Sequence, residues 1–251
     1  MRFNSRTTRE RTHSTISRIL SETTLTPAAH LTCVDAARAD IDDVVDRYHE
    51  VGVRHIVALR GDPMSGIGSA YTAHNDGYQT STDLVAAIKR RHGDMEISVS
   101  AYPEKHPESS DFETDLDVLK AKVDAGATRA ITQFFFDNDL YFRYLDRVRA
   151  AGINIPVVPG ILPVQNFKTA SNFAKRAGAT LPEWLADKFD GLDDDAETRK
   201  LVAATVAAGQ VQKLFKHGVE NFHFYTMNRA DLVFAISHLL GIRPNGAQKA
   251  A

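Results

Sequence analysis

The sequence is short of several features that define particular classes of protein. It contains a single cysteine, Cys33, so it can form no internal disulfide and offers none of the paired-cysteine spacings of zinc fingers or ribbons. No run approaches the roughly 18 to 20 consecutive apolar residues that a membrane span requires. The formal net charge of −2 goes with no clustered basic excess of the kind that binds nucleic acid or an anionic membrane. We therefore expect a protein of a reducing cytoplasm, with neither nucleic acid nor membrane as a partner.

What is present is ordinary for a globular protein. Hydrophobic residues make up 43% of the 251 positions and charged residues 25%, which is enough for a sizeable core. No internal repeat, low-complexity tract or proline-rich linker divides the chain. We predict a single domain over residues 1–251.

The N-terminal segment can be interpreted in two ways. Its first eighteen residues mix serine and threonine with five arginines: Arg2, Arg6, Arg9, Arg11 and Arg18. A mitochondrial transit peptide has this composition. The alternative is a basic amphipathic helix from about Thr8 to Ser21, with Ile16, Ile19 and Leu20 on one apolar face. We favour the helix.

Short apolar runs alternate along the chain with stretches of helical periodicity. Strands are predicted at about Ala28–Val34, His55–Leu59, Ile97–Ala101, Ala130–Phe135, Pro156–Ile161 and Asn221–Tyr225. Further helices are predicted at about Ile41–Val51, Thr82–Arg91, Phe112–Ala125, Asp139–Ala151, Asn166–Ala177, Ala196–His217 and Asp231–Leu240. Because a helix follows each strand, we expect parallel strands joined by right-handed crossovers, which is the α/β class.

A doubly wound open sheet and a closed (β/α)8 barrel both satisfy this alternation. Polar residues follow the C-terminal end of nearly every predicted strand: Thr32, Asp35, Arg60, Asp62, Tyr102, His106, Gln133, Tyr225 and Arg229. In a barrel all strand C-termini meet at one mouth, whereas an open sheet concentrates its site at a switch point. The sequence also has no glycine-rich fingerprint of the dinucleotide type. We predict a TIM barrel.

The predicted barrel has too few strands. Six strands are found where a barrel of this kind has eight, and the chain opens directly on a helix. We therefore expect about the first two strands and the first helix, about 45 to 60 residues, to be lacking.

The triplet Arg60-Gly61-Asp62 opens a long loop from Pro63 to Ser81 that is rich in glycine, serine and small polar residues. By itself such a triplet is typical of a surface turn with a solvated ion pair. Loops of this length inside compact domains are usually functional or mobile. The position of the triplet at the end of a strand therefore favours a functional role.

Three other strand ends leave alternatives open. The segment Tyr102–Pro107 is either a structural loop or a place where an aromatic ring stacks on a planar ligand and His106 bonds a phosphate or ribose. Gln133 is either satisfied inside the barrel or faces a ligand with complementary amide edges. Arg229 either belongs to a helix N-terminal turn or holds a carboxylate.

No metal site is predicted. The run Asp193-Asp194-Asp195 is more economically the N-cap of the long helix that follows. His217, His223 and His238 share no spacing that suggests a set of ligands, and we interpret them as structural.

Several ordered motifs together resemble bacterial 5,10-methylenetetrahydrofolate reductase. They are Arg11–Ser14 (RTHS), His30–Cys33 (HLTC), His55–Asp62 (HIVALRGD), Ala101–Pro107 (AYPEKHP), Lys122–Phe136 (KVDAGATRAITQFFF), Pro159–Val164 (PGILPV), Asp190–Leu201 (DGLDDDAETRKL) and Phe222–Arg229 (FHFYTMNR). The match runs from about Thr7 to Pro244. So many motifs in order make the resemblance highly specific.

The resemblance implies a flavoenzyme of one-carbon and methionine metabolism that forms homo-oligomers. Such an enzyme holds FAD at the barrel mouth, takes hydride from NADH or NADPH, and passes it to methylenetetrahydrofolate to give 5-methyltetrahydrofolate. The positions that match the family's FAD-binding residues are His30, Arg60, Gly61, Asp62, Ser81, Tyr102, His106, Asp115 and Lys122. Those that match its folate-binding residues are Asp62, Gln133, Thr169, Phe173 and Arg229. Asp62 is implied as an electrostatic catalyst that stabilises the iminium formed when the folate ring opens.

One departure from the family concerns its general acid. The family carries a glutamate in a Phe-Glu-Phe-Phe-Pro-Pro segment of its first strand, and this sequence contains no such segment. Loss of a positioned general acid typically costs about 10²–10⁴ in rate, so we expect weak activity at best. The alternatives are a flavin- or folate-binding barrel without catalysis, and a different pterin-using barrel such as a folate-dependent methyltransferase.

Overall fold

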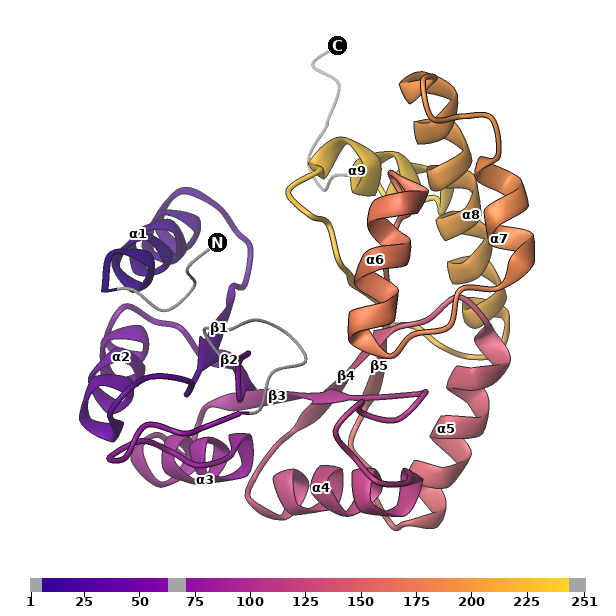
Figure 1. Ribbon diagram of the computed structural model, residues 1–251. Coiled ribbons are helices and arrows are strands. Elements are labelled where there is room, and N and C mark those ends of the chain that lie inside the picture. The colour runs from indigo at the N-terminus through magenta and orange to yellow at the C-terminus, as the bar shows by residue number, and fades with distance from the viewer. Residues whose placement is uncertain (1–5, 63–70, 244–251) are drawn as a thin grey trace. The chain divides into compact units, whose positions relative to one another are not determined.

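The computed structural model describes residues 6–62 and 71–243 (Figure 1). Its strands are β1 (Ala28–Thr32), β2 (His55–Leu59), β3 (Glu96–Ala101), β4 (Arg129–Phe134), β5 (Val157–Ile161) and β6 (His223–Phe224). Its helices are α1 (Arg6–Glu22), α2 (Arg38–Glu50), α3 (Ser81–Arg91), α4 (Phe112–Asp124), α5 (Asn138–Ala150), α6 (Phe167–Ala177), α7 (Glu183–Phe189), α8 (Ala196–Lys216) and α9 (Ala230–Leu239).

The strands follow chain order, β1 to β6, in one sheet, and the pairs β1–β2, β2–β3 and β5–β6 are parallel. In the first pairs Ala28 lies opposite His55, and His55 lies opposite Glu96. In the last pair Gly160 lies opposite His223. The predicted α/β class with parallel strands is confirmed. Each predicted element is found with its bounds shifted by a few residues at most, and α7 was not predicted.

The chain forms two compact units that interleave along the sequence. The first comprises Met1–Ala101, Glu108–Ile131 and Val148–Val157. The second comprises Tyr102–Pro107, Thr132–Arg147 and Val158–Ala251. The division between the units falls inside β4 and again inside β5.

The core of the first unit lies between β2 and the helices that pack against the strands. Ile56, Val57 and Ala58 of β2 are buried in succession, as expected of a parallel strand covered on both faces. Helix α3 begins with a capping box, in which the Thr80 side chain accepts from the Asp83 N–H and the Asp83 side chain accepts from the Thr80 N–H.

The predicted N-terminal helix is present as α1. Ile16 of this helix is buried, and the ring of His13 stacks on that of Tyr48 in α2 with centroids 6.1 Å apart. The helix predicted for this segment is therefore confirmed, with Ile16 buried and His13 in contact with α2. Within the described residues, no helix is long and apolar enough to cross a membrane.

The second unit is built around the long helix α8. Its buried face carries small side chains, Ala203, Ala204, Ala207 and Ala208, followed by larger ones further along the helix. The helix begins at Asp195, whose side chain accepts a hydrogen bond from the Thr198 N–H at 2.9 Å. The predicted capping role of this acidic run is confirmed.

Part of the long loop predicted to run from Pro63 to Ser81 falls outside the described residues. The structure describes it from Tyr71 onward, up to the N-cap Thr80 of α3. The arginine at position 2 also lies outside the described residues, as does the end of the family match at Pro244.

Candidate functional site

Arg60 follows β2 directly and makes a bidentate ion pair with Glu108. Its two terminal nitrogens lie 2.5 and 2.9 Å from the two carboxylate oxygens. Its guanidinium carbon also lies 4.5 Å from the centre of the Tyr71 ring. The ion pair is therefore made with a residue 48 positions away, and not within the Arg60-Gly61-Asp62 turn. Because the pair is partly exposed, it is worth little, and an anionic ligand could replace Glu108 at small cost.

Gly61 allows the turn after β2 to pass close to β1. It has a φ of +87°, and a Cβ at this position would lie 2.5 Å from a methyl carbon of Val34 and 3.0 Å from Cβ of Thr32. Neither the backbone angle nor the space suits a larger residue. Glycine is therefore required for the backbone to lie where it does beside Arg60.

Lys122 of α4 is a buried cation. Its Nζ donates to the carbonyl and the hydroxyl oxygen of Ser100, at 3.1 and 3.4 Å, and the residue is only 5% exposed. Burial lowers the pKa of Lys122 to about 8, an effect that Asp115 opposes and Arg60 reinforces. Lys122 and Arg60 thus act on each other, and a bound anion between them would relieve their repulsion.

Asp115 lies about two turns before Lys122 on α4 and is also buried. Its carboxylate accepts a hydrogen bond from the Ser109 hydroxyl at 3.0 Å. The first unit therefore contains a buried carboxylate and a buried ammonium on the same helix. The negative charge of Asp115 partly offsets the positive charge of the buried Lys122.

The other residues predicted for the first unit lie at strand and helix ends. His30 is exposed on β1, on the same face as Thr32. Asp62 is exposed, and the described segment ends with it. Ser81 is the first residue of α3, beside the capping box, where backbone N–H groups lack partners within the helix.

In the second unit, the loop from Tyr102 to Pro107 packs against the end of α6. The rings of Tyr102 and His106 meet edge to face, with centroids 4.6 Å apart. The carboxylate of Glu104 accepts from the Thr180 N–H at 3.0 and 3.1 Å. These contacts hold the two rings that were considered for ligand binding, and they show that the loop also has a structural role.

The second unit contains a cavity of about 630 Å³. Three of the predicted folate-binding residues line it: Thr169 and Phe173 of α6, and Arg229 at the start of α9. The cavity lies beside the N-terminal end of α6, where the Asn166 side chain accepts from the Thr169 N–H at 2.8 Å. Its size is within the range of small-molecule sites, about 300–1,000 Å³.

Sequence reasoning missed several residues of this cavity. Arg176 is one turn after Phe173 on α6 and supplies a second arginine to the lining. Met227 also lines the cavity. Its backbone has a left-handed φ of 49°, in the turn before α9 begins. The spacing of four and then three residues from Thr169 to Phe173 to Arg176 places them on one helix face, and this signal could have found Arg176.

Gln133 of β4 does not line this cavity. Its Oε1 accepts from the Phe134 N–H at 3.1 Å, and the residue borders a much smaller cavity with Tyr102 and Phe134. The Phe134 ring lies 5.1 Å from that of Phe173. Gln133 therefore neighbours Phe134, and the Phe134 ring in turn lies beside Phe173 of the larger cavity.

The predicted site residues thus fall into two groups. The first unit holds His30, Arg60, Gly61, Asp62, Ser81, Asp115 and Lys122, and the second holds Tyr102, His106, Gln133, Thr169, Phe173 and Arg229. The first group offers the positive charges of Arg60 and Lys122, and a glycine at the turn that carries Arg60. These suit an anionic ligand. The second offers an aromatic and arginine-lined cavity suited to a planar ligand with a carboxylate.

Known proteins resemble this chain over most of its length. The family model for methylenetetrahydrofolate reductase matches residues 2–241. The 5,10-methylenetetrahydrofolate reductase of Pectobacterium carotovorum subsp. carotovorum is 51% identical over 241 residues, which cover 96% of this chain and 78% of that protein. The protein of the same name from Escherichia coli (strain K12) is 51% identical over 238 residues, which cover 94% of this chain and 77% of that protein.

A solved structure is similar to this chain in fold. It is described as an uncharacterized protein from Clostridium thermocellum that binds two copies of 5-methyl-5,6,7,8-tetrahydrofolic acid. The two share a TM-score of 0.51 and 14% sequence identity, over 96% of this chain and 92% of the other. At this identity the likeness concerns the fold alone.

Proposed function

The chain belongs to the methylenetetrahydrofolate reductase family, and from this we propose that it reduces 5,10-methylenetetrahydrofolate to 5-methyltetrahydrofolate. The proposed cofactor is FAD, and the proposed hydride donor is NADH or NADPH. The observation that carries the proposal is the cavity of the second unit, because Thr169, Phe173 and Arg229 line it together. The resemblance of the sequence to the family independently implies these three as folate contacts.

The residues of the first unit fit an FAD pyrophosphate. Arg60 and Lys122 supply positive charge, and Gly61 lets the turn that carries Arg60 pass close to β1. In the proposal these residues hold the phosphates and the ribityl chain, together with His30, Ser81 and Asp115. The resemblance also implies Tyr102 and His106 as FAD-binding residues. When bound, FAD supplies the hydride-transfer chemistry.

The cavity of the second unit is proposed to take the folate. Phe173 stacks on a planar ring, first that of the nicotinamide and then that of the pterin. Arg229 holds a carboxylate of the glutamate tail, and Gln133 offers an amide to ring edges. By the resemblance, Asp62 is proposed to stabilise, through its negative charge, the cationic iminium that forms when the imidazolidine ring opens.

The same proposal extends to the architecture and setting of the protein. We infer that the parallel α/β sheet belongs to a (β/α)8 barrel that forms one catalytic domain. We also infer a cytoplasmic homo-oligomer, as in the family that the sequence resembles. Size-exclusion chromatography with light scattering tests the oligomeric state directly.

The test of function uses the purified 251-residue chain. Its visible spectrum reports bound flavin, an NADH–menadione assay reports the first half-reaction, and a methylenetetrahydrofolate assay reports the second. Bound flavin with both half-reactions supports the full proposal. Flavin bound without folate turnover assigns instead the non-catalytic alternative, which the absence of a Phe-Glu-Phe-Phe-Pro-Pro segment raised. A chain that folds and retains no flavin contradicts the proposal.

A further inference from the structure

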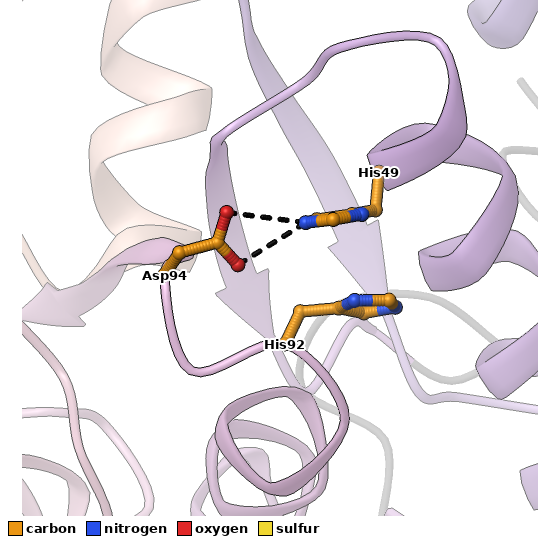
Figure 2. Close-up of side chains that lie close together, drawn as sticks. All are labelled: His49, His92 and Asp94. Carbon is orange, nitrogen blue, oxygen red and sulfur yellow. Dashed lines mark hydrogen bonds and ion pairs between the residues drawn. The ribbon is translucent and has the colours of Figure 1, made fainter.

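Among the described residues, one group of three side chains has ligand atoms close enough to hold a metal ion. His49, His92 and Asp94 each offer one such atom, and these atoms all lie within 4.8 Å of one another. Figure 2 shows the two imidazole rings stacked one above the other with the carboxylate at their side. The ring centroids are 4.0 Å apart, with an angle of 17° between the planes.

The three residues come from separate elements of the first unit. His49 lies in the last turn of α2, His92 directly follows α3, and Asp94 lies in the turn before β3. They gather at the end of the unit where β2 and β3 begin. Arg60 follows the opposite end of β2, which is five residues long, or about 16 Å. The group is therefore separate from the residues proposed to hold FAD.

His92 is held by a carboxylate that would orient it toward an ion. Its Nε2 lies 2.7 Å from Oδ1 of Asp46. The same carboxylate accepts hydrogen bonds from the guanidinium of Arg91 on both of its oxygens, so Asp46 acts as an acceptor toward both neighbours. His92 must therefore donate from Nε2, which leaves the lone pair on Nδ1 free to bind a metal. Metal-ligating histidines commonly have such a carboxylate partner on the other nitrogen.

His49 and Asp94 are already joined at the place that an ion would occupy. The Nε2 of His49 lies 3.1 Å from both oxygens of Asp94 (Figure 2). An ion inserted between them would bind Nε2 in place of the shared proton, which would move to Nδ1 of the same ring. Arg54 pairs with Oδ2 of Asp94 at 3.1 Å, so Oδ1 is the oxygen open to the metal.

We propose that His49, His92 and Asp94 bind a divalent ion of the zinc class, which clamps the ends of α2 and α3 to the turn before β3. Two imidazoles and one carboxylate, with a water in the fourth position, are a ligand set that zinc accepts. Bonds of about 2 Å in a tetrahedral site place ligand atoms about 3.3 Å apart. Closing the site requires the two imidazoles to turn out of their stacked arrangement, so that an in-plane lone pair of each points at the same ion.

The proposal is tested with Co²⁺, whose visible bands report four-coordinate binding, on the untagged 251-residue chain. One equivalent is expected to bind, and Zn²⁺ is expected to displace it. The substitutions His49→Gln and His92→Gln should each abolish the bands, and Asp46→Asn should weaken binding about 10–100-fold by releasing the orientation of His92. The control is His217→Gln, at an exposed histidine outside the group, which should bind as the parent does.

A second measurement does not depend on the folding of a variant. Histidine-selective ¹H–¹⁵N spectra of the parent chain should show that Zn²⁺ shifts the imidazole signals of His49 and His92 and leaves that of His217 in place. Absence of binding at millimolar Co²⁺ overturns the proposal. So does binding that both glutamine variants retain, or Zn²⁺ shifts confined to other histidines. Flavin content, measured in the same samples, should not change, which separates this proposal from the proposed reductase.

Discussion

Gly160 of β5 donates its N–H to the side-chain oxygen of Thr132 in β4, at 2.8 Å. Thr132 is fully buried, and its carbonyl oxygen accepts a second bond from the Tyr225 hydroxyl at 2.9 Å. Burial raises the pKa of Tyr225 above its ordinary value, and the charge of Tyr102 adds a smaller effect in the same direction, so the hydroxyl remains a donor at neutral pH. Three segments of the second unit are therefore joined at Thr132.

Substitution of Gly160 by alanine should disrupt this junction. A Cβ would lie 2.3 Å from the Thr132 carbonyl oxygen and 2.7 Å from a ring carbon of Tyr225, and neither atom can move without breaking the bonds just described. We expect Gly160→Ala to lower the free energy of unfolding by about 3 kcal/mol or more. Urea denaturation measures the change.

The matched control for that substitution is Gly209→Ala. Gly209 lies inside α8, and a Cβ there would meet no atom within 4 Å. Because alanine favours helix over glycine, this variant should gain up to about 1 kcal/mol. Equal stability of the two variants would show that the space around Gly160 is not restrictive.

Lys122 should make the stability of the protein depend on pH. Burial lowers its pKa to about 8 in the folded state, below its value in the unfolded chain, so the folded state binds fewer protons between pH 8 and about 10.4. The unfavourable free energy of burying the charged Lys122 side chain is therefore fully present below pH 8. It disappears as the pH rises through this range. We expect Lys122→Met to stabilise the protein by about 1–3 kcal/mol at pH 7 and to lose that advantage by about pH 10.5.

Denaturation of both proteins at a series of pH values measures this difference. Lys120→Met is the control, because Lys120 is on the same helix but exposed and pairs with Asp124 at the surface. Its effect should be small and independent of pH between 7 and about 10. A stabilisation by Lys122→Met that stays constant up to about pH 10.5 would contradict the assigned cause.

Arg60→Gln should weaken flavin binding far more than it weakens the fold. The ion pair with Glu108 is partly exposed, so its loss should cost less than about 1 kcal/mol of stability. A charge-assisted bond to phosphate is worth about 1.5–3 kcal/mol, which is about 10–100-fold in the FAD dissociation constant. Flavin fluorescence measures this constant. Arg54→Gln, at another arginine of the same unit, should leave it unchanged, and an unchanged constant in Arg60→Gln would remove Arg60 from the FAD site.

Arg229→Gln should reduce the affinity for folates that carry a glutamate tail. Arg229 lines the cavity of the second unit, and a bidentate pair with a carboxylate should be worth about 10-fold or more in affinity. Pteroate, which lacks the glutamate, is the matched ligand and should bind the variant and the parent alike. A substitution that weakens both ligands equally would place Arg229 at the ring rather than at the tail.

Much of the fold followed from patterns within short segments. The alternation of apolar strands and periodic helices predicted each strand, and β2 was found with its predicted bounds. Helix α7 was missed because seven residues after Pro182 are too few to show a helical period. The resemblance implied five folate-binding residues, of which Thr169, Phe173 and Arg229 line one cavity, whereas Gln133 does not.

Pairings between distant residues could not be predicted in the same way. The partner of Arg60 is Glu108, and no spacing in the sequence relates the two. The sequence predicted no metal site, because His49, His92 and Asp94 have no ligand spacing until two helices and a turn bring them together.

By itself the sequence determined the class of fold, the order of its elements and the family to which the chain belongs, because these depend on local periodicity and on motifs read in order. Only the tertiary structure decided which charges are buried and which side chains meet. Burial lowers the pKa of Lys122, and close packing requires glycine at Gly61 and Gly160. These properties arise from atoms that approach one another across the fold, where desolvation and excluded volume act regardless of separation along the chain.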